Sequence, residues 1–223
     1  MLQMHRRAMI LILMMTKIIS KKGMEMKKFW AILFSGLLAW NATAEAAVDA
    51  TKAENFVKNL TQEGIEQLIN SNVSETEKKA RFTKLFNEDL DLDFIGKFVL
   101  GRYWRTATPT QRQDFIDVYR KLNIQTWSAR FDEFKGKHFE FLGTETSKSA
   151  DQIFVNTQVP MPEGAPASVK WRVKDTNGKM RVVDIIIENV SLAQTARSEY
   201  TGYIQKSPKG IDGLIADLKA KLK

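Results

Sequence analysis

The hydrophobic positions recur first at helical spacing. Residues 49–71 carry apolar side chains three to four apart, which is typical of an amphipathic helix. Ser74-Glu75-Thr76-Glu77 reads as a capping box that opens a second helix. Leu92, Ile95 and Val99 share one helical face in the next segment. Thr108-Pro109-Thr110-Gln111 then predicts the start of a long helix, with Thr108 as N-cap, that ends near Lys135-Gly136.

The pattern then changes to alternation, which predicts strands. Asn177-Gly178 lies between two of these runs and favours a tight hairpin. On the run that follows residue 167, valines and a tryptophan alternate with lysines and an arginine, so one face of the sheet is covered and the other is wet. The predicted strands are His138–Leu142, Gln152–Val159, Ser168–Lys174 and Met180–Ile187.

Helical spacing returns at Leu192–Gln205 and at Gly210–Lys221. Helices, then four strands joined by short turns, then helices predict an α+β domain whose antiparallel sheet is covered by helices on one face. No composition shift marks a domain boundary after residue 46, so we expect a single domain over residues 47–223.

The first 46 residues have the pattern of a secretory signal segment. A basic start at Met26-Lys27-Lys28 precedes the apolar run Phe29–Trp40, and small residues follow up to Ala46. Cleavage is expected after Ala44 or Ala46, and an uncleaved N-terminal anchor is the alternative. A second apolar run lies upstream, so residues 1–23 are interpreted as an over-long start.

Most of the net positive charge of the chain lies in this N-terminal segment. The chain has a formal net charge of +8, but residues 1–44 hold seven of its 34 Lys and Arg and one of its 26 Asp and Glu, which leaves about +2. The stretch FVLGRYWR at residues 98–105 mixes aromatic and basic side chains, as nucleic-acid clamps do. A nearly neutral exported chain argues against nucleic acid, because backbone binding needs concentrated positive charge.

Few residues point to catalysis. The chain has no cysteine, which excludes disulfides and thiolate chemistry, and His138 is the only histidine after residue 46, which excludes a two-histidine metal site. Nucleophile-elbow, zinc-protease and nucleotide-binding motifs are absent. Asp184 lies within an apolar run, where it could act as a general base; alternatively it faces solvent or pairs with Arg172 or Arg181. We predict no catalytic residue, metal or cofactor.

Two further clusters leave alternatives open. Basic residues gather on one hairpin and form either a solvated sheet face or a docking patch for an acidic partner or anionic membrane: Lys170, Arg172, Lys174, Lys179 and Arg181. Aromatic residues are dense throughout residues 94–200, and they form either plain core or the lining of an apolar cavity.

Three segments carry a family resemblance. FIGKFVLGRYWRTATPTQRQDF at residues 94–115, VKWRVKDTNGKMRVVDIIIENVSLAQTARSEY at 169–200 and GIDGLIADLKAKL at 210–222 resemble, in order, the MlaC/toluene-tolerance (Ttg2) family. One departure is Asn189, where the family usually has glycine. That change predicts a backbone position with positive φ, which Asn tolerates best after Gly.

The resemblance implies a fold like that of NTF2, with helices on a curved four-stranded sheet around a deep apolar cavity. It implies a monomeric, non-enzymatic periplasmic carrier whose cargo is phospholipid. Its partners would be an inner-membrane ABC transporter complex with a periplasmic substrate-binding ring and an outer-membrane lipoprotein–porin complex. Two alternatives are an NTF2-like enzyme that uses Asp184 as base and a periplasmic interaction module without a ligand.

The candidate site residues follow from apolar facing and position. Arg102 and Arg105 are candidates for contact with a lipid head group, and Lys170 and Arg172 for contact with a partner. The predicted cavity wall is Phe98, Val99, Tyr103, Trp104, Tyr119, Trp127, Trp171 and Ile185.

Overall fold

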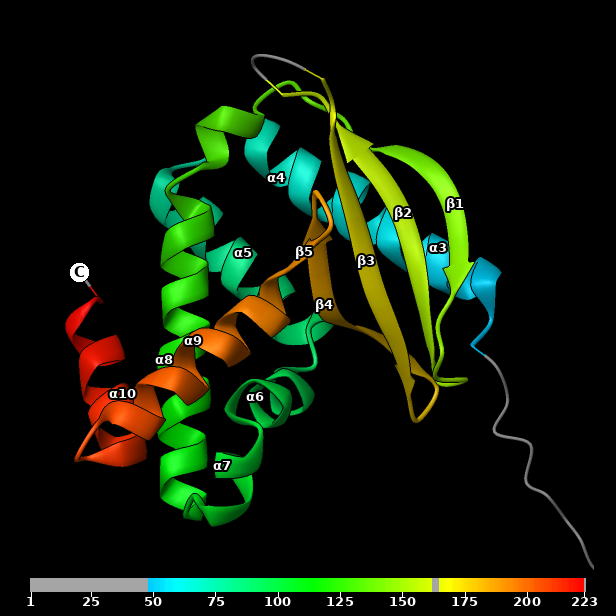
Figure 1. The fold of residues 1–223 in the computed structure, drawn as a ribbon. Helices are drawn as coiled ribbons and strands as arrows, with labels where there is room; N and C mark the ends of the chain where they lie inside the picture. The colour runs from blue at the N-terminus through cyan, green and yellow to red at the C-terminus, as the bar shows by residue number, and fades with distance from the viewer. Residues whose placement is uncertain (1–47, 162–164, 223) are drawn as a thin grey trace, which may run out of the picture. The chain divides into compact units, whose positions relative to one another are not determined.

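A group of helices lies beside an antiparallel sheet in the computed structural model of the chain (Figure 1). The structure describes residues 48–161 and 165–222, which belong to one compact unit, Glu45–Lys223. The predicted signal segment, residues 1–46, lies outside these described residues, so it stays a prediction. Among the residues described, no helix is both long and apolar enough to cross a membrane.

The first described helix runs without a break from Ala50 to Asn70, close to the predicted 49–71, but it is not uniform. It consists of α3 (Ala50–Lys58), the π-helix η1 (Asn59–Glu66) and α4 (Gln67–Asn70). The Thr61 hydroxyl donates to the carbonyl of Val57 at 2.8 Å, a side-chain bond that competes with the regular helical ladder. Such wide turns are often found at functional sites.

The next helices begin where the sequence signals predict. Ser74 caps α5 (Glu75–Asp89) by accepting from the backbone N–H of Glu77 at 3.2 Å. A short break at Gly101, with φ of 53°, separates α6 (Leu92–Leu100) from α7 (Arg102–Thr106). Thr108 and Gln111 form the predicted capping box of α8 (Pro109–Ser128).

The end of this long helix differs from the prediction. α8 ends at Ser128 and is followed by the 3-10 helix η2 (Phe131–Phe134), whereas the apolar spacing predicted helix up to Lys135-Gly136. Phe131 is buried and meets the ring of Phe82 edge-on, with ring centroids 5.2 Å apart. Because this residue still faces the core, the hydrophobic spacing continues across the break and does not reveal it.

The sheet has five strands rather than the predicted four. In the order β1-β2-β3-β4-β5, all neighbours are antiparallel. The fifth strand has only two residues, too few for an alternating pattern to be visible in the sequence. The strands are β1 (Glu140–Thr146), β2 (Gln152–Val159), β3 (Ala167–Thr176), β4 (Lys179–Ile187) and β5 (Val190–Ser191).

Two tight turns join the last three strands. Asn177-Gly178 has φ of 56° and 81° and forms the predicted hairpin between β3 and β4. Glu188-Asn189 has φ of 48° and 64° and joins β4 to β5, so the predicted positive φ at Asn189 is confirmed. β1 differs from the predicted His138–Leu142, because it begins at Glu140 and its pairing with β2 is interrupted between Phe141 and Gly143.

The apolar side chains form two cores. α3 and η1 lie along one face of the sheet (Figure 1), where Ala53 and Val57 pack with Val155, Trp171 and Val173. The second core joins α5, α6 and α8 to α9 (Leu192–Lys206) and α10 (Gly210–Ala220). The architecture is therefore α+β, as predicted; its likeness to NTF2 stays a prediction.

Candidate functional site

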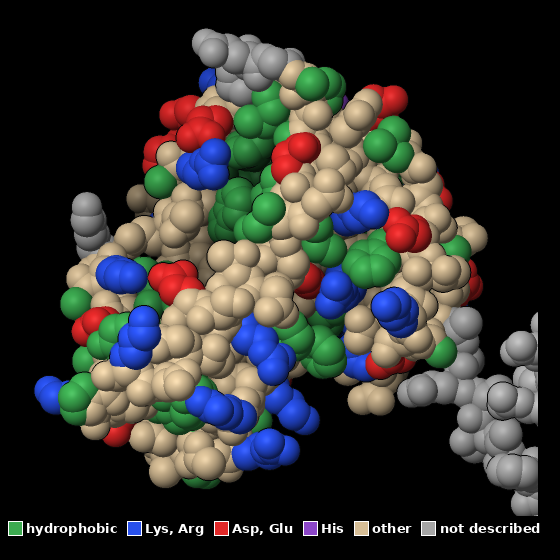
Figure 2. All heavy atoms as spheres, in the orientation of Figure 1, with side chains coloured by type: hydrophobic (Ala, Val, Ile, Leu, Met, Phe, Trp, Pro, Cys, Tyr) green, Lys and Arg blue, Asp and Glu red, His purple; other side chains and the backbone are tan. Residues whose placement is uncertain are grey.

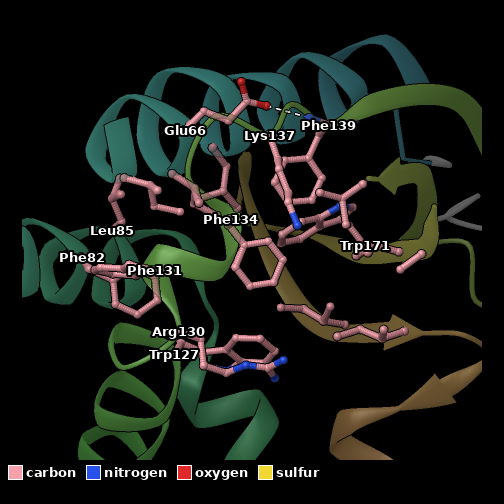
Figure 3. Close-up of a pocket in the computed structure, with 18 of the residues that line it drawn as sticks. Glu66, Phe82, Leu85, Trp127, Arg130, Phe131, Phe134, Lys137, Phe139 and Trp171 are labelled. Carbon is pink, nitrogen blue, oxygen red and sulfur yellow. Dashed lines mark hydrogen bonds between the residues drawn. The ribbon is translucent and has the colours of Figure 1, made fainter. Parts of the chain in front are cut away.

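A cavity of about 210 Å³ lies where the two cores meet. It is larger than the ~150 Å³ engineered cavity that binds benzene, so it has room for an apolar ligand. Figure 2 shows hydrophobic side chains in a hollow between the helices and the sheet, and Figure 3 shows the wall. The wall includes Leu60, Ile65 and Ile69 from the first helix, Phe82, Leu85 and Phe86 from α5, Trp127 from α8, Phe131 and Phe134 from η2, and Val159, Val169, Trp171, Ile185 and Ile187 from the sheet.

Trp171 presents only carbon to this cavity. Its indole N–H donates to the hydroxyl of Thr157 at 3.0 Å, and that hydroxyl donates to the carbonyl of Val169 at 2.9 Å. Phe139 meets the indole at 5.9 Å between ring centroids. Because the one polar atom of the indole is satisfied inside the sheet, the rest of the ring can serve as apolar wall.

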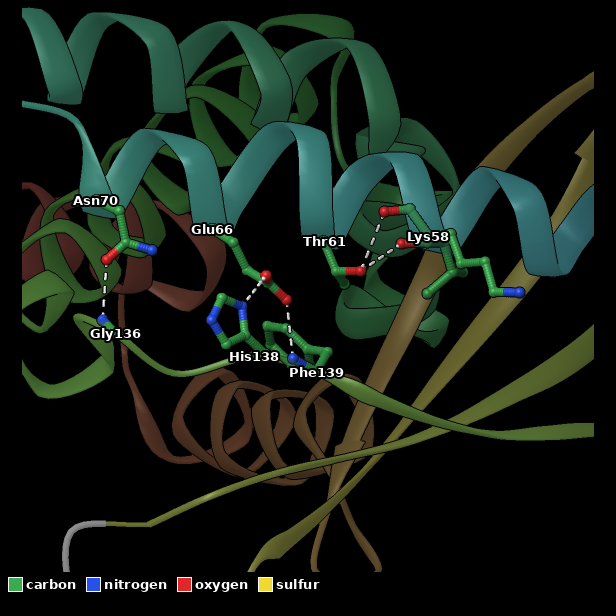
Figure 4. Close-up of polar contacts among 8 residues, drawn as sticks. Lys58, Thr61, Glu66, Asn70, Gly136, His138 and Phe139 are labelled. Carbon is green, nitrogen blue, oxygen red and sulfur yellow. Dashed lines mark hydrogen bonds and ion pairs between the residues drawn. The ribbon is translucent and has the colours of Figure 1, made fainter.

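Glu66 is a buried carboxylate in the wall, and both of its oxygens are in use (Figure 4). Oε2 lies 2.7 Å from Nδ1 of His138, and Oε1 accepts from the backbone N–H of Phe139 at 2.8 Å. The side-chain oxygen of Asn70 accepts from the backbone N–H of Gly136 at 2.8 Å. These bonds fasten the first helix to the segment that leads into β1 and give each oxygen of Glu66 a partner within the protein.

Two cations also line the cavity, and the sequence analysis missed both. The Arg130 side chain, 45% exposed, pairs with Glu133 at 2.9 Å and lies over the ring of Trp127. The hydrogen bond from Arg130 lowers the pKa of Glu133 below its ordinary value. Lys137 lines the cavity from the segment after η2, with its Nζ 5.9 Å from the centroid of the Phe134 ring. Arg130 lies between α8 and η2, and Lys137 lies after η2. The irregular backbone there has no periodic pattern that would mark either residue in the sequence.

The structure divides the eight residues predicted to form the wall. Trp127, Trp171 and Ile185 line the cavity. The other five are placed in or against the helical core instead, so their predicted position in the wall is corrected: Val99 and Tyr119 are buried there, and Phe98, Tyr103 and Trp104 pack against it. These side chains are apolar because they pack in the helical core. The hydrophobic pattern of a helix is the same whether its apolar face meets a core or a cavity.

The arginines of FVLGRYWR lie on the surface of α7, away from the cavity wall. Arg102 donates to the hydroxyl of Tyr103 at 2.8 Å, and both Arg102 and Arg105 are exposed. Neither arginine lines the cavity, and their contact with a lipid head group stays a prediction. Figure 2 shows Lys and Arg side chains gathered around α6 and α7.

The basic hairpin carries its own counter-charges. Lys170 pairs with Glu145 at 2.9 Å, and Lys174 pairs with Asp151. Arg172 lies 3.9 Å from Asp184 and over the ring of Phe154. Acidic side chains interleave with the basic ones on this face (Figure 2). These pairs reduce the net charge of the hairpin; its contact with a partner stays a prediction.

The carboxylate of Asp184 stabilises the junction between the sheet and α9. Its side chain is buried, and its two oxygens accept from the Ser191 hydroxyl at 2.6 Å and from the backbone N–H of Ala193 at 3.0 Å, at the start of α9. Asp184 is not part of the cavity wall. The geometry thus gives no support to a general base in an apolar pocket. Within the described part of the chain, no group of three or more His, Asp or Glu could hold a metal ion.

The chain matches a family model described as "MlaC protein" over residues 58–220. The chain belongs to the MlaC family. This confirms the resemblance carried by the three sequence segments.

Two of three related proteins carry phospholipid in their names. The chain is 25% identical to the intermembrane phospholipid transport system binding protein MlaC of Haemophilus influenzae, over 87% of this chain and 93% of that one. It is 22% identical to the toluene tolerance protein ttg2D of Pseudomonas putida, over 56% and 59%. The solved structure of a phospholipid-binding protein from Ralstonia solanacearum, in complex with a phospholipid, superposes with a TM-score of 0.66 at 21% identity, covering 75% of this chain and 95% of that one.

Proposed function

We propose that the protein is a periplasmic carrier that holds the acyl chains of a phospholipid in the cavity between its two cores. The observation that carries this proposal is the wall itself, which gathers apolar side chains from the first helix, α5, η2 and the sheet. Each methylene removed from water is worth about 0.8 kcal/mol, so lipid tails partition strongly into such a space.

The relatives support the choice of ligand. One is named as the binding protein of an intermembrane phospholipid transport system, and the solved neighbour contains a phospholipid. The predicted signal segment supports a periplasmic location. The family resemblance supports two partners, an inner-membrane ABC transporter complex and an outer-membrane lipoprotein–porin complex. The burial energy that favours uptake also opposes release, so a partner that opens the cavity is needed at each membrane.

The direct test is the ligand content of the exported protein. The chain is purified from a periplasmic extract without detergent, and the mass of the intact protein is measured by native mass spectrometry. Any bound molecule is then extracted and identified. We expect a phospholipid to co-purify with the protein. A protein that is folded but free of lipid would contradict the proposal.

A matched pair of variants locates the binding site. Ala167 lies in the cavity wall at the start of β3, and Ser168 next to it points to the other face of the sheet. Ala167→Trp places an indole in the cavity and is expected to reduce the lipid content strongly. Ser168→Trp adds the same side chain outside the cavity and is expected to leave the lipid content unchanged. Equal lipid content in both variants would contradict this location.

A further inference from the structure

Lys137 is half-buried beside the cavity, and its ammonium group is buried. Its Nζ is enclosed by protein, and none of the described residues forms a hydrogen bond with it. The Nζ lies 5.9 Å from the centroid of the Phe134 ring. Figure 3 shows the side chain directed into the pocket on the side of Trp171. An ammonium group in apolar surroundings is costly unless an anion or several acceptors face it.

Two carboxylates on nearby segments, those of Glu66 and Glu133, form hydrogen bonds with other residues. Glu66 shares the wall with Lys137, but its oxygens are held by His138 and by the backbone N–H of Phe139. The carboxylate of Glu133 is held by Arg130 through two hydrogen bonds, at 2.9 and 3.0 Å. The charge of Lys137 contributes to the lowered pKa of Glu133, but among the described residues no carboxylate forms a hydrogen bond with its Nζ.

We propose that Lys137 binds the phosphate group of the lipid whose acyl chains fill the cavity. This inference rests on the proposed function and adds the part of the ligand that the apolar wall cannot recognise. The four-carbon stem of lysine is flexible and bends its ammonium group toward a phosphate that arrives with the lipid. Aromatic and aliphatic walls read shape loosely, whereas a cation discriminates between lipids that carry a phosphate and those that do not.

The consequence is selectivity against neutral lipids. Dioleoylphosphatidylglycerol and dioleoylglycerol share their acyl chains and differ in the phosphate-bearing head group. A hydrogen bond to a charged group contributes about 1.5–3 kcal/mol, which corresponds to a preference of about 10- to 100-fold for the phospholipid. Free inorganic phosphate lacks the tails and is expected neither to bind detectably at millimolar concentration nor to displace the lipid.

The experiment compares variants of the delipidated protein in a binding titration with both lipids. Lys137→Met is expected to lose about 10- to 100-fold in affinity for dioleoylphosphatidylglycerol and to keep the wild-type affinity for dioleoylglycerol. Lys135→Met removes an exposed lysine two positions earlier and is expected to bind both lipids as the wild type does. Lys137→Arg keeps the positive charge and is expected to retain the preference for phosphate.

Each of the other outcomes contradicts one specific element of the proposal. Wild-type selectivity in Lys137→Met would overturn the role of Lys137 while leaving the carrier function intact. Binding of neither lipid by the wild type would instead refute the carrier function. Binding of inorganic phosphate alone at Lys137 would refute the lipid as the source of the phosphate. Because Lys137→Met removes an unpaired buried charge, the lipid-free variant should unfold at or above the wild-type temperature; should it fail to fold, Lys137→Gln provides the same test.

Discussion

Replacing Asp184 by Asn separates a structural carboxylate from a catalytic one. Asp184 is 4% exposed on β4, and its oxygens hold the Ser191 hydroxyl and the backbone N–H of Ala193. These bonds fix the corner at which β5 turns into α9. Asn has the same shape and keeps one acceptor oxygen, so the substitution removes the charge with little change in packing.

The expected cost follows from these contacts. A hydrogen bond to a charged group contributes about 1.5–3 kcal/mol and a neutral one about 1 kcal/mol. The negative charge also lies at the N-terminus of α9, where it contributes a further ~0.3–1 kcal/mol. Arg172 is partly exposed and 3.9 Å away, so its ion pair adds little. Together, the free energy of unfolding should fall by about 2–3 kcal/mol, or about 5–10 °C in melting temperature for a domain of this size.

The assay combines urea unfolding with lipid content. Asp184→Asn should be less stable by this amount and should still bind lipid at temperatures where it is folded. Asp132→Asn, on the exposed side of η2, serves as control and should change stability by less than about 0.5 kcal/mol. An Asp184→Asn protein as stable as the wild type would refute the structural role. Loss of lipid binding without loss of stability would show that Asp184 acts on the ligand.

Two further predictions concern the turn after β4 and a buried tyrosine. Asn189 has φ of 64°, so Asn189→Gly should preserve stability, whereas Asn189→Val should lower it by about 1–3 kcal/mol in urea unfolding; equal stability of the two would be inconsistent with a required positive φ. Burial raises the pKa of Tyr200 to about 12. The unfolded chain loses this proton near pH 10, so the contribution of Tyr200 to stability is complete below that pH and is lost as the pH rises through about 12. Tyr200→Phe should therefore flatten the fall in stability over this range, as followed by denaturant unfolding and phenolate absorbance; an unchanged slope would rule out this origin.

Local chemistry explains what could be predicted from the sequence. The capping box at Thr108, the Asn177-Gly178 turn and the strand Gln152–Val159 depend on residues close together in the chain. Short-range preferences of this kind act before any tertiary contact forms, so they are visible in the residues themselves. The positive φ at Asn189 is predicted differently, from the glycine that the resembling family usually has at this position.

The cavity depends on contacts between distant segments, and the sequence pattern resolved it only in part. Tyr119 and Trp127 both lie on α8 and both are apolar positions, but Tyr119 joins the helical core and Trp127 reaches the cavity. The hydrophobic periodicity of a helix shows which face is buried, but it does not show whether that face packs against other helices or lines a cavity. Glu66 and Lys137 are polar residues in irregular or π-helical backbone, where no periodic pattern marks them as part of a wall.

In the proposed carrier, the lipid tails lie between Trp127 and Trp171 and not beside Trp104. Trp104 belongs to the helical core, and its backbone carbonyl accepts from Arg112 at 2.9 Å. Three variants of the exported chain, each keeping one of these tryptophans and carrying Phe at the other two, are loaded with a phospholipid whose acyl chains are brominated. Bromine quenches tryptophan fluorescence on contact, so we expect strong quenching of Trp127 and Trp171 and little quenching of Trp104. Quenching of Trp104 with Trp127 and Trp171 unaffected would contradict it.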